Sequence, residues 1–139
     1  MKAQLKPDVD LRTFVIDDVT YNCTAIVGWS NYYASTCGFI VSTKGKAPAV
    51  LKDRIVNGYC YVILSSGKFQ KQCRVHRLIA EAFLTTPSED RVGRERDQVN
   101  HLDRNTRNNK VANLEWVSCA ENNAHFRLLE AIERGAAND

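Results

Sequence analysis

The segment from Val99 to His125 reads VNHLDRNTRNNKVANLEWVSCAENNAH and holds seven asparagines and two histidines. A neutral imidazole can accept a proton near neutral pH, and an amide oxygen is a neutral ligand for a hard cation. Hydrolysis of a phosphodiester uses both groups, because the imidazole takes a proton from water while the cation neutralises charge on the phosphoryl and leaving oxygens. Asparagine also suits irregular loops, since it bonds to nearby backbone and tolerates left-handed geometry.

The residues of this segment predict a strand, a loop, a second strand and a helix. Val99 begins the first strand, and LEWV at 114–117 forms the second. Ser118 fits a helix N-cap, with Glu121 three residues later completing a capping box, and the helix CAENNAHFRLLEAIERG stops at Gly135.

Four polar side chains would converge if this hairpin packs on the helix. Asn100 and His101 lie where the first strand ends and the loop begins. Asn122 and His125 are three residues apart, so they share one face of the helix. One histidine and two or three oxygen or nitrogen ligands would then face the same point.

Upstream of this unit, short β-prone runs are cut by turn residues. The runs read TFVIDDVTY, CTAIVGWSNYY, GFIVST, AVLKDRIV, YCYVIL and FQKQCRV. Asn-Gly at 57–58 and Ser-Gly at 66–67 are hairpin signals. HRLIAEAFL at 76–84 then changes to helical spacing, with an apolar stripe of Leu78, Ile79, Ala82 and Phe83. The order predicts an α+β protein with an N-terminal antiparallel β-sheet module and a helix, followed by the strand–loop–strand–helix unit.

Length and composition are those of one soluble globular domain. The chain has 139 residues, 44% hydrophobic and 25% charged, and no apolar run of membrane-spanning length. The start, MKAQLKPDVDLRTF, has no signal-peptide core, so we expect a cytoplasmic protein. The five cysteines form no C-x-x-C pair, which argues against a disulfide framework or a Cys-ligated zinc and predicts free, mostly buried thiols.

Positive charge is concentrated in the middle of the chain. The net charge is only +3, but residues 38–80 carry eight Lys and Arg against one acidic residue, Asp53. This patch fits a surface that faces a polyanion, although lysine-decorated strands of an ordinary sheet give the same pattern. Its cations are Lys44, Lys46, Lys52, Arg54, Lys68, Lys71, Arg74 and Arg77.

The segment at 99–125 resembles the motif of HNH nucleases, in the branch of phage and intron-encoded homing endonucleases. That branch typically reads V-[DN]-H-x-D-G-x-x-x-N-N-x-x-x-N-L-x-W-V-T, followed by a helical Asn. The matching positions are Asn100-His101, Asp103, Asn108-Asn109, Asn113-Leu114, Trp116-Val117-Ser118 and Asn122. Upstream, YASTCGFIVSTKGK, LKDRIVNGYCYVIL and VHRLIAEAF are similar to the β-rich DNA-contacting module of such nickases, so the resemblance covers about residues 32–125.

The resemblance implies a metal-dependent DNA endonuclease with a ββα-metal unit. His101 would be the general base that activates water. Asn100 and Asn122 would bind one Mg²⁺, for which Mn²⁺ can substitute, together with the scissile phosphate. Asn113 would be structural, bonding across the hairpin so that the base is aimed, and Asp103 would brace the loop in preference to binding the metal.

Two further histidines have more than one interpretation. Other HNH branches use a helical histidine for metal, so His125 is either a metal or phosphate ligand or a helix-surface residue. His76 stands at the entry of the upstream helix and is interpreted as a hydrogen-bonded structural residue.

Two positions depart from the family pattern. Asn100 stands where Asp is common, which removes a negative charge and makes metal binding lean on the DNA phosphate. Arg104 replaces the glycine of the usual turn, where it would strain the loop and supply a phosphate contact. These departures motivate the alternative hypothesis, a catalytically decayed HNH-fold module that still binds DNA.

The resemblance makes double-stranded DNA the expected partner. The candidate contacts are the cations of the basic patch with Arg104 and Arg107. A structured-RNA or junction-binding protein is a third, weaker hypothesis, because the patch does not tell DNA from RNA. One active site per chain would nick one strand. The oligomeric state stays open with a monomer favoured, and the setting would be a bacterial host cytoplasm if a phage encodes the chain.

The expected organisation has three parts. Residues 1–31 form an N-terminal segment of unknown role that is partly β, residues 32–88 form the β-rich DNA-contacting module with its helix, and residues 97–135 form the HNH unit.

Overall fold

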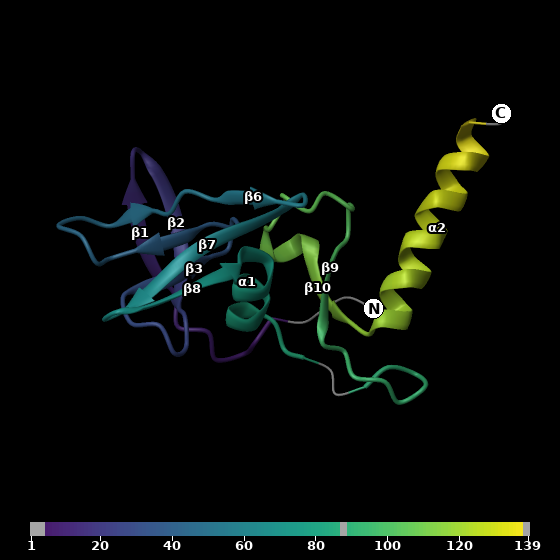
Figure 1. The fold of residues 1–139 in the computed structure, drawn as a ribbon, viewed down its shortest axis with the longest axis horizontal. Coiled ribbons are helices and arrows are strands. Elements are labelled where there is room, and N and C mark those ends of the chain that lie inside the picture. Colours follow the sequence, from purple (N-terminus) through teal and green to yellow (C-terminus); the bar gives the residue numbers. More distant parts are fainter. Residues whose placement is uncertain (1–4, 87–88, 138–139) are drawn as a thin grey trace.

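Antiparallel sheets and two α-helices make up residues 5–86 and 89–137, the part of the chain that the computed structural model describes (Figure 1). The side chains of residues 126, 129 and 133–137 lie outside that description. The α+β class expected from the sequence is confirmed. Neither described helix has the length and apolar character needed to cross a bilayer.

A five-stranded sheet and a three-stranded sheet form the first part of the fold, each an antiparallel meander. The first sheet contains β1 (Arg12–Ile16), β2 (Val19–Ala25), β3 (Tyr32–Ser35), β4 (Ile40–Ser42) and β5 (Ala49–Val50), in that order. The second contains β6 (Arg54–Val56), β7 (Tyr59–Ser66) and β8 (Phe69–Arg74). The predicted hairpins are confirmed, since β6 pairs with β7 around Asn57-Gly58 and β7 pairs with β8. The second turn is Gly67-Lys68, one residue later than the Ser-Gly pair predicts.

The first β-prone run, TFVIDDVTY, is two strands rather than one. Asp17 and Asp18 have φ of 50° and 65°, the left-handed geometry of a two-residue hairpin loop, and β1 turns back there onto β2. Apolar residues flank the two aspartates on both sides, which hides the turn in the sequence pattern. Asn57 and Gly58 have the same positive φ pair at the β6–β7 turn.

Helix α1 (Val75–Phe83) follows β8 directly and lies between the sheets and the last unit. The predicted stripe is largely confirmed: Leu78, Ile79 and Phe83 are buried and Ala82 is partly buried. Burial of a side chain such as Phe83 stabilises the fold by about 1.5–3 kcal/mol. Trp116 belongs to the same core cluster, so the helix joins the sheets to the C-terminal unit.

The C-terminal unit contains β9 (Gln98–His101), a short 3-10 turn η1 (Val111–Asn113), β10 (Leu114–Val117) and α2 (Cys119–Ala137). Strands β9 and β10 pair antiparallel, and the start of α2 packs on both. Figure 1 shows α2 extending away from the remainder of the molecule. The predicted capping box is confirmed, because Glu121 N–H donates to Ser118 Oγ at 3.2 Å and Ser118 N–H donates to Glu121 Oε1 at 3.0 Å.

All five cysteines are free thiols, as predicted. Cys23, Cys60 and Cys73 are buried, Cys37 is half-buried and Cys119 is exposed.

The turn between β3 and β4 presses against the loop between β9 and β10. Gly38 has φ of 93°, and a Cβ there would lie 2.5 Å from the backbone carbon of Asn109 and 2.7 Å from its oxygen. Val111 N–H donates to Thr36 O at 3.1 Å in the same contact. The five-stranded sheet therefore sets the position of the loop backbone at Asn109.

We expect Gly38→Ala to destabilise the protein more than Gly28→Ala. Both glycines have a similar positive φ, which costs an alanine roughly 1–2 kcal/mol, but a Cβ at Gly28 meets nothing within 4 Å. The free energy of unfolding from urea titration measures the difference. Equal losses in the two variants would contradict the close approach at Asn109.

Candidate active site

His101 is the last residue of β9, and its side chain is buried at 4% exposure. Its Nε2 lies 2.8 Å from Oδ1 of Asn109, which is itself buried. A carbonyl oxygen only accepts, so Nε2 carries the hydrogen of the neutral imidazole and Nδ1 keeps the lone pair. Burial raises the pKa of the Cys60 thiol in β7, and the side chain of Asn109 beside it opposes that rise.

The surroundings of His101 favour its neutral form. Burial lowers the pKa of His101 below its ordinary value of 6.5, against the smaller raising effects of the Asn109 hydrogen bond and the Asp103 carboxylate. The ring is therefore an unprotonated acceptor at neutral pH.

A cavity of about 260 Å³ opens beside His101. No acidic side chain is among its lining residues, which are Tyr59, Val99, Asn100, His101, Arg104, Thr106, Asn122, Asn123 and His125. The structure brings together three of the predicted site residues from β9 and α2, namely His101, Asn100 and Asn122, along with His125. The cavity wall is thus neutral or basic.

Two amides of the cavity have their NH₂ groups engaged elsewhere. Asn100 Nδ2 donates to Glu115 Oε1 at 3.3 Å across the β9–β10 pair. Asn122 Nδ2 donates to Gln98 Oε1 at 3.2 Å. Each contact leaves the amide oxygen as the atom that a hard cation would use, and such outer contacts orient ligands at metal sites.

A metal ion in this cavity would be bound mainly by amide oxygens, because the cavity is lined by three asparagines and no carboxylate. Within residues 5–86 and 89–137, no group of three or more His, Cys, Asp or Glu side chains is placed to hold a metal ion.

The loop after His101 is braced by Asp103 and Asn113. Asn113 Nδ2 donates to Asp103 Oδ1 at 2.9 Å, and Asp103 N–H donates to Asn113 Oδ1 at 3.1 Å. Asn108 Nδ2 donates to the other carboxylate oxygen at 2.9 Å. Burial opposes ionisation of Asp103, but the hydrogen bonds from Asn108, the Asn105 backbone and Asn113 outweigh it and lower its pKa below the ordinary value. Neither Asp103 nor Asn113 lines the cavity.

Arg104 occupies the left-handed position expected from the family's glycine. Its φ is 63°, its backbone N–H donates to His101 O at 2.9 Å, and its side chain lines the cavity. A non-glycine residue in this geometry is strained by about 1–2 kcal/mol.

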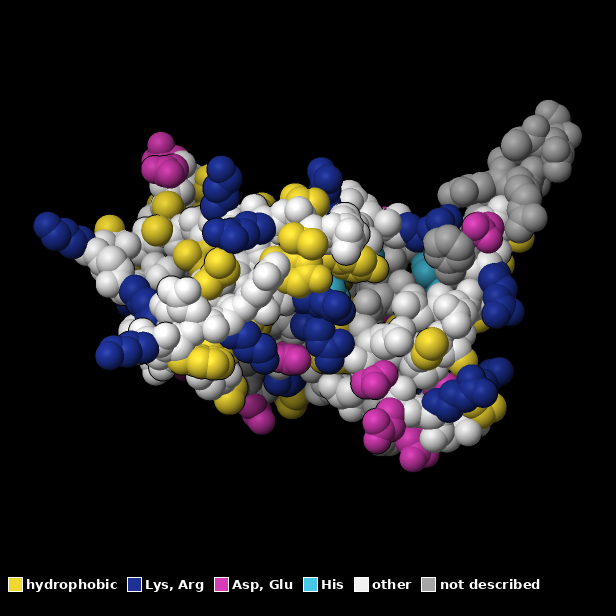
Figure 2. All heavy atoms as spheres, viewed as in Figure 1, with side chains coloured by type: hydrophobic (Ala, Val, Ile, Leu, Met, Phe, Trp, Pro, Cys, Tyr) yellow, Lys and Arg dark blue, Asp and Glu magenta, His cyan; other side chains and the backbone are white. Residues whose placement is uncertain are grey.

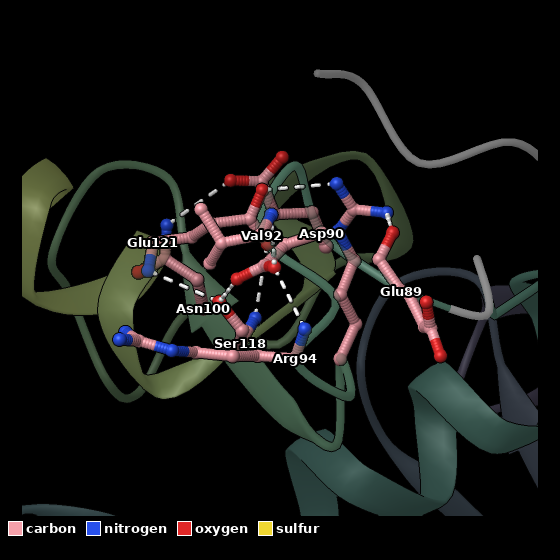
Figure 3. A network of polar contacts seen from close by, with 9 residues as sticks. Glu89, Asp90, Val92, Arg94, Asn100, Ser118 and Glu121 are labelled. Carbon is pink, nitrogen blue, oxygen red and sulfur yellow. Dashed lines mark hydrogen bonds and ion pairs between the residues drawn. The ribbon is translucent and has the colours of Figure 1, made fainter.

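A polar network fixes the first turn of α2 up to Glu121, the residue before Asn122 (Figure 3). Arg96 forms a two-pronged ion pair with Glu121, with N–O distances of 2.8 and 3.0 Å. Ser118 Oγ donates to Asp90 Oδ2, while the other oxygen of Asp90 accepts from the backbone of Val92 and Arg94. The segment at 89–96 thereby holds the helix end that carries Asn122.

His125 and His76 both lie near His101. His125 Nε2 donates to Leu102 O at 3.3 Å, which leaves Nδ1 as its acceptor atom. His76, in the first turn of α1, packs its ring 5.1 Å from the His101 ring, measured between centroids. It is buried, and its Nδ1 has no hydrogen-bond partner among the described residues.

Sequence reasoning gave no role to Asn109, Tyr59 or Asn123. Asn109 belongs to the Asn108-Asn109 pair of the motif, which was the available signal. Tyr59 precedes the motif by about forty residues and reaches the cavity only through the fold.

The predicted DNA-contacting cations lie in several environments. Figure 2 shows Lys and Arg side chains spread over the sheet region and histidine visible on the same face. Eight of the ten predicted cations are exposed; Arg77 and Arg104 are half-buried. Arg54, Tyr61 and Arg74 stand in one row across β6, β7 and β8. Arg77 instead bonds to Asp97 O at 2.9 Å and lies over the Trp116 ring.

No family model matches the chain, but three proteins are similar to it. Two curated relatives, both named as uncharacterized HNH endonucleases of Acanthamoeba polyphaga mimivirus, are 33% identical over 97 residues and 31% identical over 118 residues. These matches cover 69% and 83% of this chain but 27% and 25% of the relatives, so the chain spans about a quarter of their length.

A solved structure on DNA binding and cleavage by the HNH homing endonuclease I-HmuI is similar in fold. Its TM-score is 0.57 at 29% sequence identity, over 81% of this chain and 59% of that chain.

We expect the protein to lose stability as the pH falls below 6.5, in part through His76. Burial first, then the charges of His101, Arg74 and Arg77, lower the pKa of His76 to about 3. The unfolded chain binds a proton near pH 6.5 and the folded chain does not, so each pH unit between these values costs up to about 1.4 kcal/mol.

Urea unfolding of the wild type and His76→Phe between pH 7 and pH 4.5 measures this contribution. The variant should show a shallower loss of stability over that range. Parallel stability curves would contradict a neutral, buried His76.

Proposed function

Because the chain belongs to the HNH endonuclease family, we propose that it is a metal-dependent endonuclease that hydrolyses phosphodiester bonds in duplex DNA. The observation that carries this proposal is the state of His101. It is buried beside the cavity, donates Nε2–H to Asn109 and keeps Nδ1 as its proton acceptor. A neutral imidazole held by a second residue is what a general base requires.

In the proposed reaction, Nδ1 of His101 takes a proton from a water molecule that attacks the phosphorus. The water oxygen bonds to phosphorus as the bond between phosphorus and the 3′ oxygen breaks, and the released 3′ oxygen takes a proton from solvent, leaving 3′-hydroxyl and 5′-phosphate ends. Asn109 keeps its hydrogen bond to Nε2 as the imidazole becomes charged. Asn113 and Asp103 hold the loop that carries Asn109.

The cavity fits one divalent cation, Mg²⁺ with Mn²⁺ as a substitute, held by the amide oxygens of Asn100 and Asn122. Both are hard, neutral ligands whose NH₂ groups bond elsewhere, and His125 is a further candidate through Nδ1. When bound, the ion supplies neutralisation of charge on the phosphoryl and leaving oxygens. Because no carboxylate lines the cavity, the DNA phosphate would supply the negative charge that the site lacks.

Double-stranded DNA would be held by cations around the cavity. Arg104 lines it, and we assign this side chain to a phosphate next to the scissile bond. Arg54 and Arg74, in one row on the three-stranded sheet, would contact the duplex away from the cut. The remaining candidates are Lys44, Lys46, Lys52, Lys68, Lys71, Arg77 and Arg107. Most would bind backbone phosphates, which positions the duplex and makes binding salt-dependent.

The proposal also covers the type of cut and the setting in which the enzyme acts, and one active site per chain implies cleavage of one strand at a time. A monomer would nick one strand, in the manner of homing nickases encoded by phages, and would act in the cytoplasm of the host.

A catalytically decayed DNA-binding module is the second candidate. It is favoured by the same cavity lining, since Asn100 stands where the family often has Asp and no acidic side chain replaces it. Such a module would bind duplex DNA without cutting it.

We expect Mg²⁺ or Mn²⁺ to support conversion of supercoiled plasmid to open circles, and EDTA or His101→Ala to abolish it. Removal of the base should reduce the nicking rate at least about a hundredfold. Because burial lowers the pKa of His101, the rate should fall with decreasing pH only below pH 6.5.

Lys110→Ala is the matched control, because it removes an exposed charge from the same loop without touching the cavity. Salt-sensitive DNA binding without cleavage under any metal would establish the decayed module instead.

We expect Asn100→Asp to lower the Mg²⁺ concentration for half-maximal nicking roughly tenfold, because it adds a negative ligand. The new carboxylate would face Glu115, which now accepts from Asn100. The variant is therefore paired with Asn100→Asp/Glu115→Gln, which removes that repulsion. An unchanged or higher Mg²⁺ requirement in both would show that residue 100 does not bind the metal.

A further inference from the structure

Three rings from three separate elements meet at the base. Tyr59 begins β7, His76 lies in the first turn of α1, and His101 ends β9. The ring centroids are 5.4 Å apart for Tyr59 and His76, 5.1 Å for His76 and His101, and 6.2 Å for Tyr59 and His101. The interplanar angles of 41°, 57° and 52° are those of tilted ring packing.

The His76 ring acts in this cluster as an uncharged packing group. Its side chain is 4% exposed, and its Nδ1 has no hydrogen-bond partner among the described residues. Burial and the nearby cations Arg74 and Arg77 lower its pKa to about 3, so it stays neutral beside the base.

The hydrogen bond to Asn109 constrains His101 at one atom only. A ring held at Nε2 can still tilt about that contact, and a tilt would move Nδ1 away from the attacking water. Tilted packing against a second ring restricts this freedom. His76 is the ring whose centroid lies nearer to His101 than that of Tyr59.

We propose that His76 is a positioning residue for the nuclease reaction. Its ring limits tilting of the His101 ring, while the hydrogen bond from Nε2–H to Asn109 fixes the position of Nε2. This inference rests on the proposed function, because it assigns His101 the role of the base. It also joins two parts of the chain, since His76 comes from the helix that follows the β-rich module and His101 from the C-terminal unit.

The test compares plasmid nicking by His76→Ala and His76→Phe at several plasmid concentrations. His76→Ala should lower kcat by about tenfold to a hundredfold, because a small misplacement of the base is costly. Its KM and its DNA affinity in EDTA should stay within about twofold of the wild type, since the ring does not line the cavity. His76→Phe keeps a neutral ring and should restore kcat to within about threefold.

Leu78→Ala is the matched control for a purely structural effect. It truncates another buried side chain of α1 that is not one of the three rings, so kcat should be unchanged at temperatures where the variant is folded. Loss of kcat in Leu78→Ala equal to that in His76→Ala would overturn the proposal. Equal loss in His76→Phe and His76→Ala would also overturn it, because ring packing would then not be the function of His76.

A measurement without catalysis separates this inference from the proposed function. In ¹⁵N-edited NMR spectra, the Nε2–H of His101 should be visible and slow to exchange in the wild type and in His76→Phe. It should broaden or exchange faster in His76→Ala. An unchanged signal in His76→Ala would refute the positioning of the His101 ring by His76. Absence of nicking in the wild type would instead refute the proposed function, and this NMR result would not depend on it.

Discussion

The position of one amide, that of Asn109, governs the geometry of the whole candidate site. Its oxygen accepts the hydrogen bond from His101 Nε2–H, which leaves Nδ1 as the imidazole nitrogen that can accept a proton. Its backbone is pressed against Gly38, where there is no room for a Cβ. The contact between the β3–β4 turn at Gly38 and the loop at Asn109 therefore influences which nitrogen of His101, the last residue of β9, carries the hydrogen.

The site is assembled at the junction between the β-rich part and the C-terminal unit. Helix α1 supplies Phe83 and Ile79 to the shared core, and its His76 ring packs against the His101 ring. Strand β7 contributes Tyr59 to the cavity and Cys60 to the contact with Asn109. The C-terminal unit carries the residues of the motif. The β-rich part contacts two of them, Asn109 through Gly38 and His101 through Tyr59.

Contacts between residues close in the sequence could be predicted, whereas contacts between distant elements could not. The capping box of Ser118 and Glu121 was predictable because a helix places residues three apart side by side. The grouping of Asn100, His101 and Asn122 followed from a motif with fixed spacing. The contacts of His76 and Tyr59 with His101 were not predictable, because they depend on how α1 and β7 pack on β9. The Asp17–Asp18 turn was missed because apolar residues on both sides continued the strand pattern.

Helix α2 is anchored at its first turn, so displacements of the helix are small near that turn and larger toward its C-terminal end. The helix has 19 residues and is about 28 Å long. The ion pair of Arg96 with Glu121 and the bond of Ser118 to Asp90 hold its first turn as a pivot. Asn122 follows Glu121 directly and lies about 6 Å along the helix from Ser118, so sideways motion at the far end would reach it reduced roughly fivefold. A load carried at the outer end of α2 would thus leave the amide oxygen of Asn122 nearly in place.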